Sequence, residues 1–203
     1  EGSSKGRYYK RIRAWAARIK ERILDRKLGI ETLQESIFMG SLDQESDSPY
    51  QPAPYGRLEA AMRFFKPDGR DVFVDLGCGK GRAVFLAATH KFKKVIGVEK
   101  DKHVYDMALQ NAKSFKCRSK KVPIELLHMD AADFDPVEST VFFLFNPFGQ
   151  TTLEKVLKRI ENPQRRLSPP RVLSNGNLAV IKDGKVTAYS ASKNFNRLSS
   201  LGD

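Results

Sequence analysis

The sequence has little cysteine and histidine and no long apolar run. Its two cysteines, Cys78 and Cys117, form no CxxC pair and no cluster with the three histidines. We therefore predict no disulfide framework and no metal site, and a reducing intracellular compartment, the cytoplasm, as the location. No run of about 18 apolar residues occurs, so no membrane span is expected. The N-terminus also lacks the apolar core of a secretory signal.

Internal repeats are absent as well, which excludes solenoid architectures. The chain does contain enough apolar material for a core, since 40% of its 203 residues are hydrophobic and it has 13 Phe. This length and composition predict one sizeable globular domain with an appendage.

The net charge of +12 is concentrated at the two ends of the chain. Residues 1–30 carry ten Lys or Arg against three Asp or Glu, and residues 151–203 carry ten against four. Basic ends around a nearly neutral middle favour a polyanionic partner, RNA first, bound by these N- and C-terminal segments. The alternative is that the surface cations only keep the protein in solution.

Residues 1–48 are predicted to form a basic amphipathic helix and an acidic linker, and residues 49–203 the main domain. Apolar residues at spacings of three and four, Trp15 among them, indicate a helix over 7–28 that Gly29 ends. We expect the apolar stripe to pack on the domain. The alternative is that the basic face contacts phosphates through Arg7, Lys10, Arg11, Arg13, Arg18 and Arg22.

Buried strands alternate with helices along the main domain. The predicted strands are 71–76, 94–99, 122–128 and 140–145, and the predicted helices are 56–65, 81–91, 101–115 and 151–161. Strands that are apolar on both faces, separated by helices, predict a mostly parallel sheet with helices on both faces, a Rossmann-like α/β fold.

The C-terminal end of this sheet is open to two interpretations. Residues 178–190 predict a hairpin that turns at Asp183-Gly184. Either 171–173 forms a very short fifth strand, or 178–181 is the fifth strand and the sheet is incomplete.

Four groups of candidate site residues follow four consecutive strands. They are Asp75 with Gly77, Cys78, Gly79 and Gly81; Glu99; Asp130 with Ala131; and Asn146 with Pro147 and Phe148. The carboxyl ends of parallel strands share one edge, where open α/β sheets bind ligands. We therefore expect the four groups to form one site.

Each group suits part of a nucleoside ligand. Glycines allow the backbone to turn sharply and approach the ligand, and the amides that begin the next helix can bind an anionic group. Glu99 can accept hydrogen bonds from both ribose hydroxyls. Asp130 can accept one from an exocyclic amine, and the Ala131 amide can donate to a ring nitrogen.

The spacing of the glycines separates two cofactors. The dinucleotide fingerprint G-x-G-x-x-G requires its third glycine at position 82, which is Arg82 here. The observed G-x-G-x-G after Asp75 resembles motif I of the class I S-adenosylmethionine-dependent methyltransferases. The resemblance extends over residues 50–160 through "VFVDLGCGKG", "IGVEKD", "LLHMDAADF" and "FLFNPFG".

The resemblance implies a class I methyltransferase fold, S-adenosylmethionine as the cofactor and a role for each group. Asp75 organises the loop and faces the methionine amino group, while Gly77 and Gly79 pass beside the methionine and ribose. Glu99 holds the ribose hydroxyls. Asp130 and Ala131 recognise the adenine.

The fourth group implies the reaction. "NPF", Asn146 to Phe148, resembles the Asn/Asp-Pro-Pro-Tyr/Phe motif of methyltransferases that act on planar nitrogens. There a side-chain amide and a backbone carbonyl orient the amine, so positioning does most of the catalytic work. Phe148 stands here where that motif has its second proline, and Gly149 where it has the aromatic residue.

A second resemblance points to another acceptor. The segments "YGRLEAAMRFF", "DVFVDLGCGKGRAVFLAA" and "IGVEKD" resemble those of the non-SET histone lysine methyltransferases. That family carries a D-L-G-S-G-x-G loop, a G-V-E-K strand end and an Asn-x-x-Phe-Gly stretch, and Cys78 stands here in place of the loop serine. This resemblance implies that Tyr50 or Tyr55 lines a channel for a lysine chain, the alternative for both being packing.

We therefore expect a methyltransferase that N-methylates RNA or another nucleic acid, with protein lysine as the alternative acceptor. A non-catalytic cofactor-binding adaptor for nucleic acid is a further alternative. An NAD-dependent oxidoreductase is disfavoured by Arg82.

Overall fold

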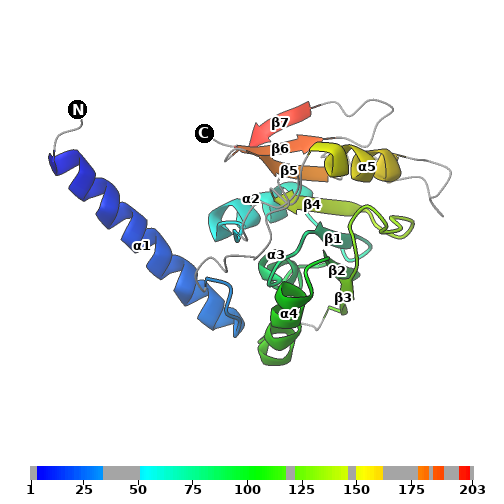
Figure 1. Cartoon of the computed structure of the whole chain (residues 1–203), viewed down its shortest axis with the longest axis horizontal. Coiled ribbons are helices and arrows are strands. Elements are labelled where there is room, and N and C mark those ends of the chain that lie inside the picture. Colours follow the sequence, from blue (N-terminus) through cyan, green and yellow to red (C-terminus); the bar gives the residue numbers. More distant parts are fainter. Residues whose placement is uncertain are drawn as a thin grey trace.

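The computed structural model describes residues 4–33, 51–117, 122–145, 150–161, 178–182, 185–189 and 197–201. These residues form a seven-stranded sheet in the order β3-β2-β1-β4-β5-β6-β7 with helices around it (Figure 1). The strands are β1 (Val72–Leu76), β2 (Lys94–Glu99), β3 (Ile124–His128), β4 (Val141–Phe145), β5 (Leu178–Lys182), β6 (Lys185–Tyr189) and β7 (Arg197–Leu201). The helices are α1 (Ser4–Leu28), α2 (Tyr55–Phe65), α3 (Arg82–Ala87), α4 (Lys102–Ser114) and α5 (Gln150–Glu161).

The first five strands are parallel and confirm the predicted α/β fold. Strand β1 is buried along its whole length, and its side chains alternate between two apolar clusters. Phe73 packs with Leu58 of α2 and Val84 of α3 on one face of the sheet. Val74 packs with Val156 of α5 on the other. This two-sided cover holds the carboxyl ends of β1 to β4 at one edge.

The C-terminal strands settle which predicted segment continues the sheet. The segment Leu178–Lys182 is β5, parallel to β4 and antiparallel to β6, so the predicted hairpin is confirmed. The prediction that the sheet is incomplete is wrong, because β7 pairs antiparallel with β6 and brings the sheet to seven strands. The residues 171–173 and the turn 183–184 lie outside the described part.

The N-terminal helix ends where the sequence predicts. Gly29 has φ of +70°, and a Cβ there would lie 2.4 Å from the carbonyl oxygen of Ser114, so glycine is required on both counts. The linker from residue 34 onward and the predicted domain boundary after residue 48 lie outside the described residues.

The expected packing of the apolar stripe of α1 is wrong. Trp15 is 66% exposed, and Tyr8, Ile12, Ile19 and Ile23 are exposed too. The helix instead attaches near its end through Glu21, Leu24, Asp25 and Leu28. At 3.6 residues per turn these four lie on the side opposite the stripe.

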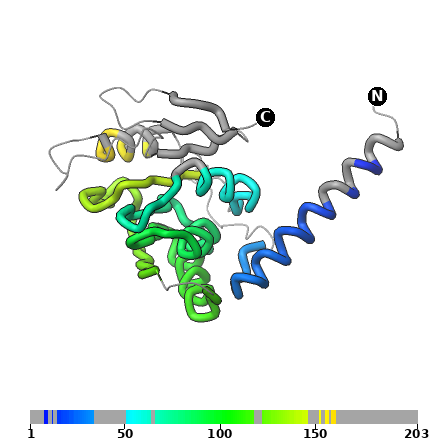
Figure 2. Tube along the Cα trace, turned by 180° about the vertical axis from the view of Figure 1, so that it is seen from behind, coloured from blue at the N-terminus to red at the C-terminus, as the bar shows by residue number. Residues whose placement is uncertain are grey.

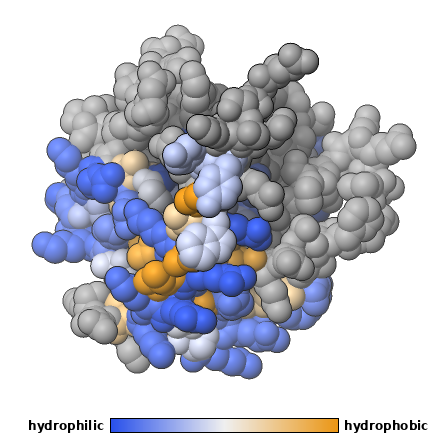
Figure 3. Space-filling model, turned by 90° about the vertical axis from the view of Figure 1, so that its left-hand side faces the viewer, coloured by the Kyte–Doolittle hydropathy of each residue, from blue (hydrophilic) through white to orange (hydrophobic). Residues whose placement is uncertain are grey.

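Most of α1 therefore projects from the body of the protein (Figure 2). Hydrophobic side chains are exposed among hydrophilic ones on the face viewed in Figure 3. Within the described ranges, no helix is both long and apolar enough to cross a membrane.

Candidate cofactor site

The loop after β1 turns sharply and is tied to the end of β2. Gly77, Gly79 and Gly81 have backbone φ angles of +80°, +56° and +87°, which residues with a Cβ rarely adopt. The amides of Gly77 and Cys78 both donate to the carbonyl of Val98 at 2.9 Å. The glycines thus let the backbone fold over the end of the neighbouring strand.

Gly81 closes the loop and begins α3. Its amide donates to the carbonyl of Cys78 at 2.9 Å, and its φ is left-handed. A Cβ at this position would lie 2.6 Å from the ring of Phe85. The loop can therefore be this tight only with glycine at position 81.

Glu99 accepts two backbone hydrogen bonds at the end of β2. Its Oε2 accepts from the amide of Gly79 and its Oε1 from the amide of Asp101, each at 2.9 Å. Burial raises the pKa of this carboxyl, and the two amides partly oppose that shift. Each oxygen keeps a second lone pair, so the predicted bonds from ribose hydroxyls are compatible with this role.

Asp75 is buried beside Glu99. Burial raises its pKa well above the usual range, and the charge of Glu99 raises it further. Among the described residues, no Lys, Arg or His forms an ion pair with either carboxylate. Two acidic groups that no cation of the described residues pairs with suit a positively charged ligand, which S-adenosylmethionine is through its sulfonium and ammonium groups.

Asp130 and Ala131 follow the end of β3. Asp130 is exposed, and its Oδ1 accepts a 2.7 Å hydrogen bond from the amide of Ala132, so one oxygen caps the local turn. Ala131 is buried in the apolar cluster that includes Phe134. The proposed contacts of Asp130 and Ala131 with adenine stay a prediction.

Cys78 contributes its amide to the loop and its side chain to the core. The thiol lies against Gly97, where a Cβ would come within 3.0 Å of its Sγ. Burial raises the pKa of the thiol, so it stays protonated and unreactive.

The candidate catalytic residues Asn146, Pro147 and Phe148 lie outside the described residues, as does Tyr50. Strand β4 ends at Phe145, directly before them, at the edge where β1 and β2 also end. Tyr55 is buried, and its hydroxyl donates to Oδ1 of Asp25 at 2.6 Å. Of its two predicted roles, packing is therefore the one observed. No group of metal-ligating residues occurs in the described part of the chain.

Arg82 was assigned no role from the sequence beyond the missing third glycine, but its side chain is buried and ion-paired with Glu21 and Asp25 of α1. A signal was present in the sequence. Within residues 4–28, which hold ten Lys or Arg, Glu21 and Asp25 are the two acids, and they stand one helical turn apart.

Comparison with solved structures agrees with the fold. The chain is similar to an RNA methyltransferase of Salinibacter ruber in complex with S-adenosyl-L-homocysteine, with 26% identity and a TM-score of 0.50. The match covers 64% of this chain and 76% of that one. The fold is that of the class I S-adenosylmethionine-dependent methyltransferases, a class whose cofactor is S-adenosylmethionine.

The family follows from a second comparison. Residues 58–196 match the family model described as histone methylation protein DOT1, and the chain belongs to this family. The resemblance to the non-SET histone methyltransferases is thereby confirmed.

Two curated relatives are similar over about half of the chain. A histone-lysine N-methyltransferase of Dictyostelium discoideum, specific for lysine 79 of histone H3, is 29% identical over 117 residues. An uncharacterised protein of Methanocaldococcus jannaschii is 32% identical over 112 residues. These matches cover 51% and 53% of this chain but only 6% and 45% of the relatives' own lengths.

Proposed function

We propose that the chain transfers the methyl group of S-adenosylmethionine to an amine nitrogen, and that the acceptor is a lysine side chain of a protein. The family match carries this proposal, because residues 58–196 include all four groups at the strand ends. This acceptor differs from RNA, which the net positive charge of the two ends of the chain favours.

The residues at the sheet edge divide the work. When bound, S-adenosylmethionine supplies an electrophilic methyl group. Glu99 orients the ribose while holding the Gly79 amide, and the buried carboxylate of Asp75 favours the cationic end of the cofactor. Asp130 and Ala131 select the adenine.

We assign Asn146, Pro147 and Phe148 to the acceptor. A side-chain amide and a backbone carbonyl there would accept hydrogen bonds from the amine and aim its lone pair at the methyl group. Correct placement of the two reactants is the main catalytic contribution available to such a site.

RNA is the second candidate acceptor, and the composition of α1 favours it. Residues 4–20 carry seven Lys or Arg and no Asp or Glu, and Arg18 and Arg22 are exposed on the projecting helix. The two acids further along the helix face Arg82 instead of solvent. Such a helix would bind phosphates, and the similarity to the Salinibacter ruber enzyme points the same way.

Methyl transfer from isotope-labelled S-adenosylmethionine to fractionated cell protein and RNA distinguishes the two acceptors. We expect label on lysine in the protein fraction, and none with Glu99→Ala. Glu125→Ala is the matched control, because Glu125 lies in β3 and pairs with Lys94 away from the site.

Label in RNA alone would replace lysine by RNA as the acceptor. Label in neither fraction would favour a small-molecule acceptor or the non-catalytic adaptor. Asn146→Ala separates the adaptor from an enzyme, because an enzyme variant should lose methyl transfer while it still binds the cofactor.

A further inference from the structure

Arg82 is a buried cation placed directly after the glycine loop. It is the first residue of α3, and its side chain is 3% exposed. A buried guanidinium is costly unless it is paired and hydrogen-bonded. Its partners therefore show what this position is built to hold.

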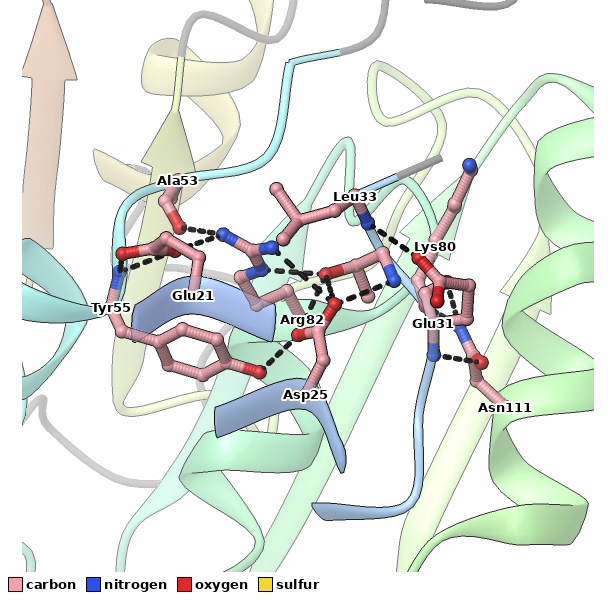
Figure 4. Close-up of polar contacts among 10 residues, drawn as sticks. Glu21, Asp25, Glu31, Leu33, Ala53, Tyr55, Lys80, Arg82 and Asn111 are labelled. Atoms are coloured by element: carbon pink, nitrogen blue, oxygen red, sulfur yellow. Dashed lines mark hydrogen bonds and ion pairs between the residues drawn. The ribbon is translucent and has the colours of Figure 1, made fainter. Parts of the chain in front are cut away.

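All partners of Arg82 among the described residues lie between Glu21 and Tyr55 (Figure 4). Nη1 donates to Oε2 of Glu21 at 2.5 Å and to the carbonyl of Ala53 at 3.2 Å. Nε donates to Oγ1 of Thr32 at 2.6 Å. Nη2 lies 3.5 Å from Oδ2 of Asp25, and the ring of Tyr55 lies 4.6 Å from the guanidinium carbon.

These partners also bind one another. Asp25 accepts hydrogen bonds from the hydroxyl of Tyr55 at 2.6 Å and from the amide of Thr32 at 2.8 Å. Glu21 accepts from the amide of Tyr55 at 3.2 Å. The end of α1 and the start of α2 are thus joined through one guanidinium.

A second connection holds the residue on the other side of Gly81. The side-chain amide of Asn111 in α4 donates to the carbonyl of Lys80 at 2.9 Å. It also exchanges hydrogen bonds with the backbone of Glu31, accepting at 2.9 Å and donating at 3.2 Å. Gly81, where a Cβ would meet the ring of Phe85, therefore lies between two residues that are each tied to the segment 21–32.

We propose that the segment 21–32 is a structural part of the cofactor site and that Arg82 is the positioning residue that connects them. This inference rests on the proposed use of S-adenosylmethionine. Every polar contact that the guanidinium makes among the described residues points toward the N-terminal segment and none toward the sheet edge, so Arg82 acts through the loop backbone. The two connections hold the loop in the conformation in which it folds over the end of β2 and bonds to Glu99.

The effect of breaking the connection follows from the partners. Without the guanidinium, Glu21 and Asp25 lose their cation, and the end of α1 has no charge partner in α3. The pairing of β1 with β2 and β4 does not involve Arg82. We therefore expect a loosened loop on an intact sheet.

The test compares Arg82→Met with Arg70→Met, a control at an exposed arginine paired with Asp68. Titration calorimetry with S-adenosyl-L-homocysteine should show binding weakened by about tenfold or more for Arg82→Met and unchanged for the control. In turnover, the KM for the cofactor should rise while kcat at saturating cofactor stays within about twofold. The affinity of Arg82→Lys, which keeps the charge but loses the planar guanidinium, should lie between those of the wild type and Arg82→Met.

Hydrogen exchange supplies a readout that does not depend on activity. Amides 77–82 should exchange faster in Arg82→Met, while those of β1 keep their protection. If Arg82→Met does not fold, Asn111→Ala tests the second connection with the same measurements. A folded variant with unchanged affinity and exchange would overturn the inference. A wild-type protein that binds no S-adenosyl-L-homocysteine would overturn the proposed function instead.

Discussion

The amide of Gly79 donates a 2.9 Å hydrogen bond to the carboxylate of Glu99. This bond joins the loop after β1 to the end of β2, so one side chain both shapes the loop and faces the ligand edge. Glu99, which we propose to bind the ribose, thus has a second role in shaping the loop, and it fulfils this role before any cofactor binds.

Glu99→Gln should weaken cofactor binding even though the side chain keeps its size. A glutamine has one acceptor oxygen, so its amide group must face one of the two backbone amides that Glu99 now serves. A buried donor left unpaired costs about 1–3 kcal/mol, and the same free energy lost from binding is roughly five- to 150-fold in the dissociation constant. Calorimetry with S-adenosyl-L-homocysteine measures the effect, and Glu125→Gln is the control. Equal affinities in the two variants would contradict the dual role.

Cofactor binding should release protons from Asp75. Its pKa is raised in the free protein by burial and by Glu99, and a cationic ligand favours the charged carboxylate and lowers that pKa. Calorimetry in buffers of different ionisation enthalpy counts the protons. We expect release that declines as the pH rises above the raised pKa, and less of it in Asp75→Asn. The same release from both proteins would remove Asp75 from the site.

Asp75 should also make the stability of the free protein depend on pH. A raised pKa in the folded state means that the folded protein binds this proton more tightly than the unfolded chain. Its contribution is therefore present below the unfolded pKa and is lost as the pH rises through the folded pKa. Urea unfolding across this range should show the wild type losing stability relative to Asp75→Asn. A pH-independent difference would be inconsistent with the burial of this carboxyl.

Gly81→Ala should destabilise the protein by about 1–3 kcal/mol, because the new Cβ meets the ring of Phe85 and the left-handed backbone is strained. The matched control is Gly56→Ala in α2, where a Cβ would have nothing within 4 Å and alanine should stabilise the helix. Urea unfolding measures both changes. Similar effects at the two positions would mean that the loop tolerates a side chain.

Tyr55→Phe should reduce stability by about 1 kcal/mol, the typical value of one hydrogen bond, because the hydroxyl is bonded to Asp25. The kcat for methyl transfer should be unchanged. A large fall in kcat with stability preserved would instead support Tyr55 as part of an acceptor channel.

The sequence predicts the centre of the sheet and the glycine loop well, because strands buried on both faces and glycines with positive φ leave unambiguous patterns. It predicts the helix α1 but not its attachment. Apolar spacing shows that a helix has two faces and does not show which one the domain covers. Here Arg82 binds the face with Glu21 and Asp25, and Trp15 is left exposed.

Two other features left weaker signals. Strand β7, "RLSSL", is short and half polar, and its assignment depends on pairing with β6 at the sheet edge. The buried role of Arg82 depends on partners about 30 to 60 positions away in the chain, which local patterns do not reveal.

The most direct test of the account is titration calorimetry of the wild-type protein with S-adenosyl-L-homocysteine and, separately, with NAD. We predict saturable binding of S-adenosyl-L-homocysteine that Glu99→Ala abolishes, and no binding of NAD. Tight binding of NAD without binding of S-adenosyl-L-homocysteine would contradict it.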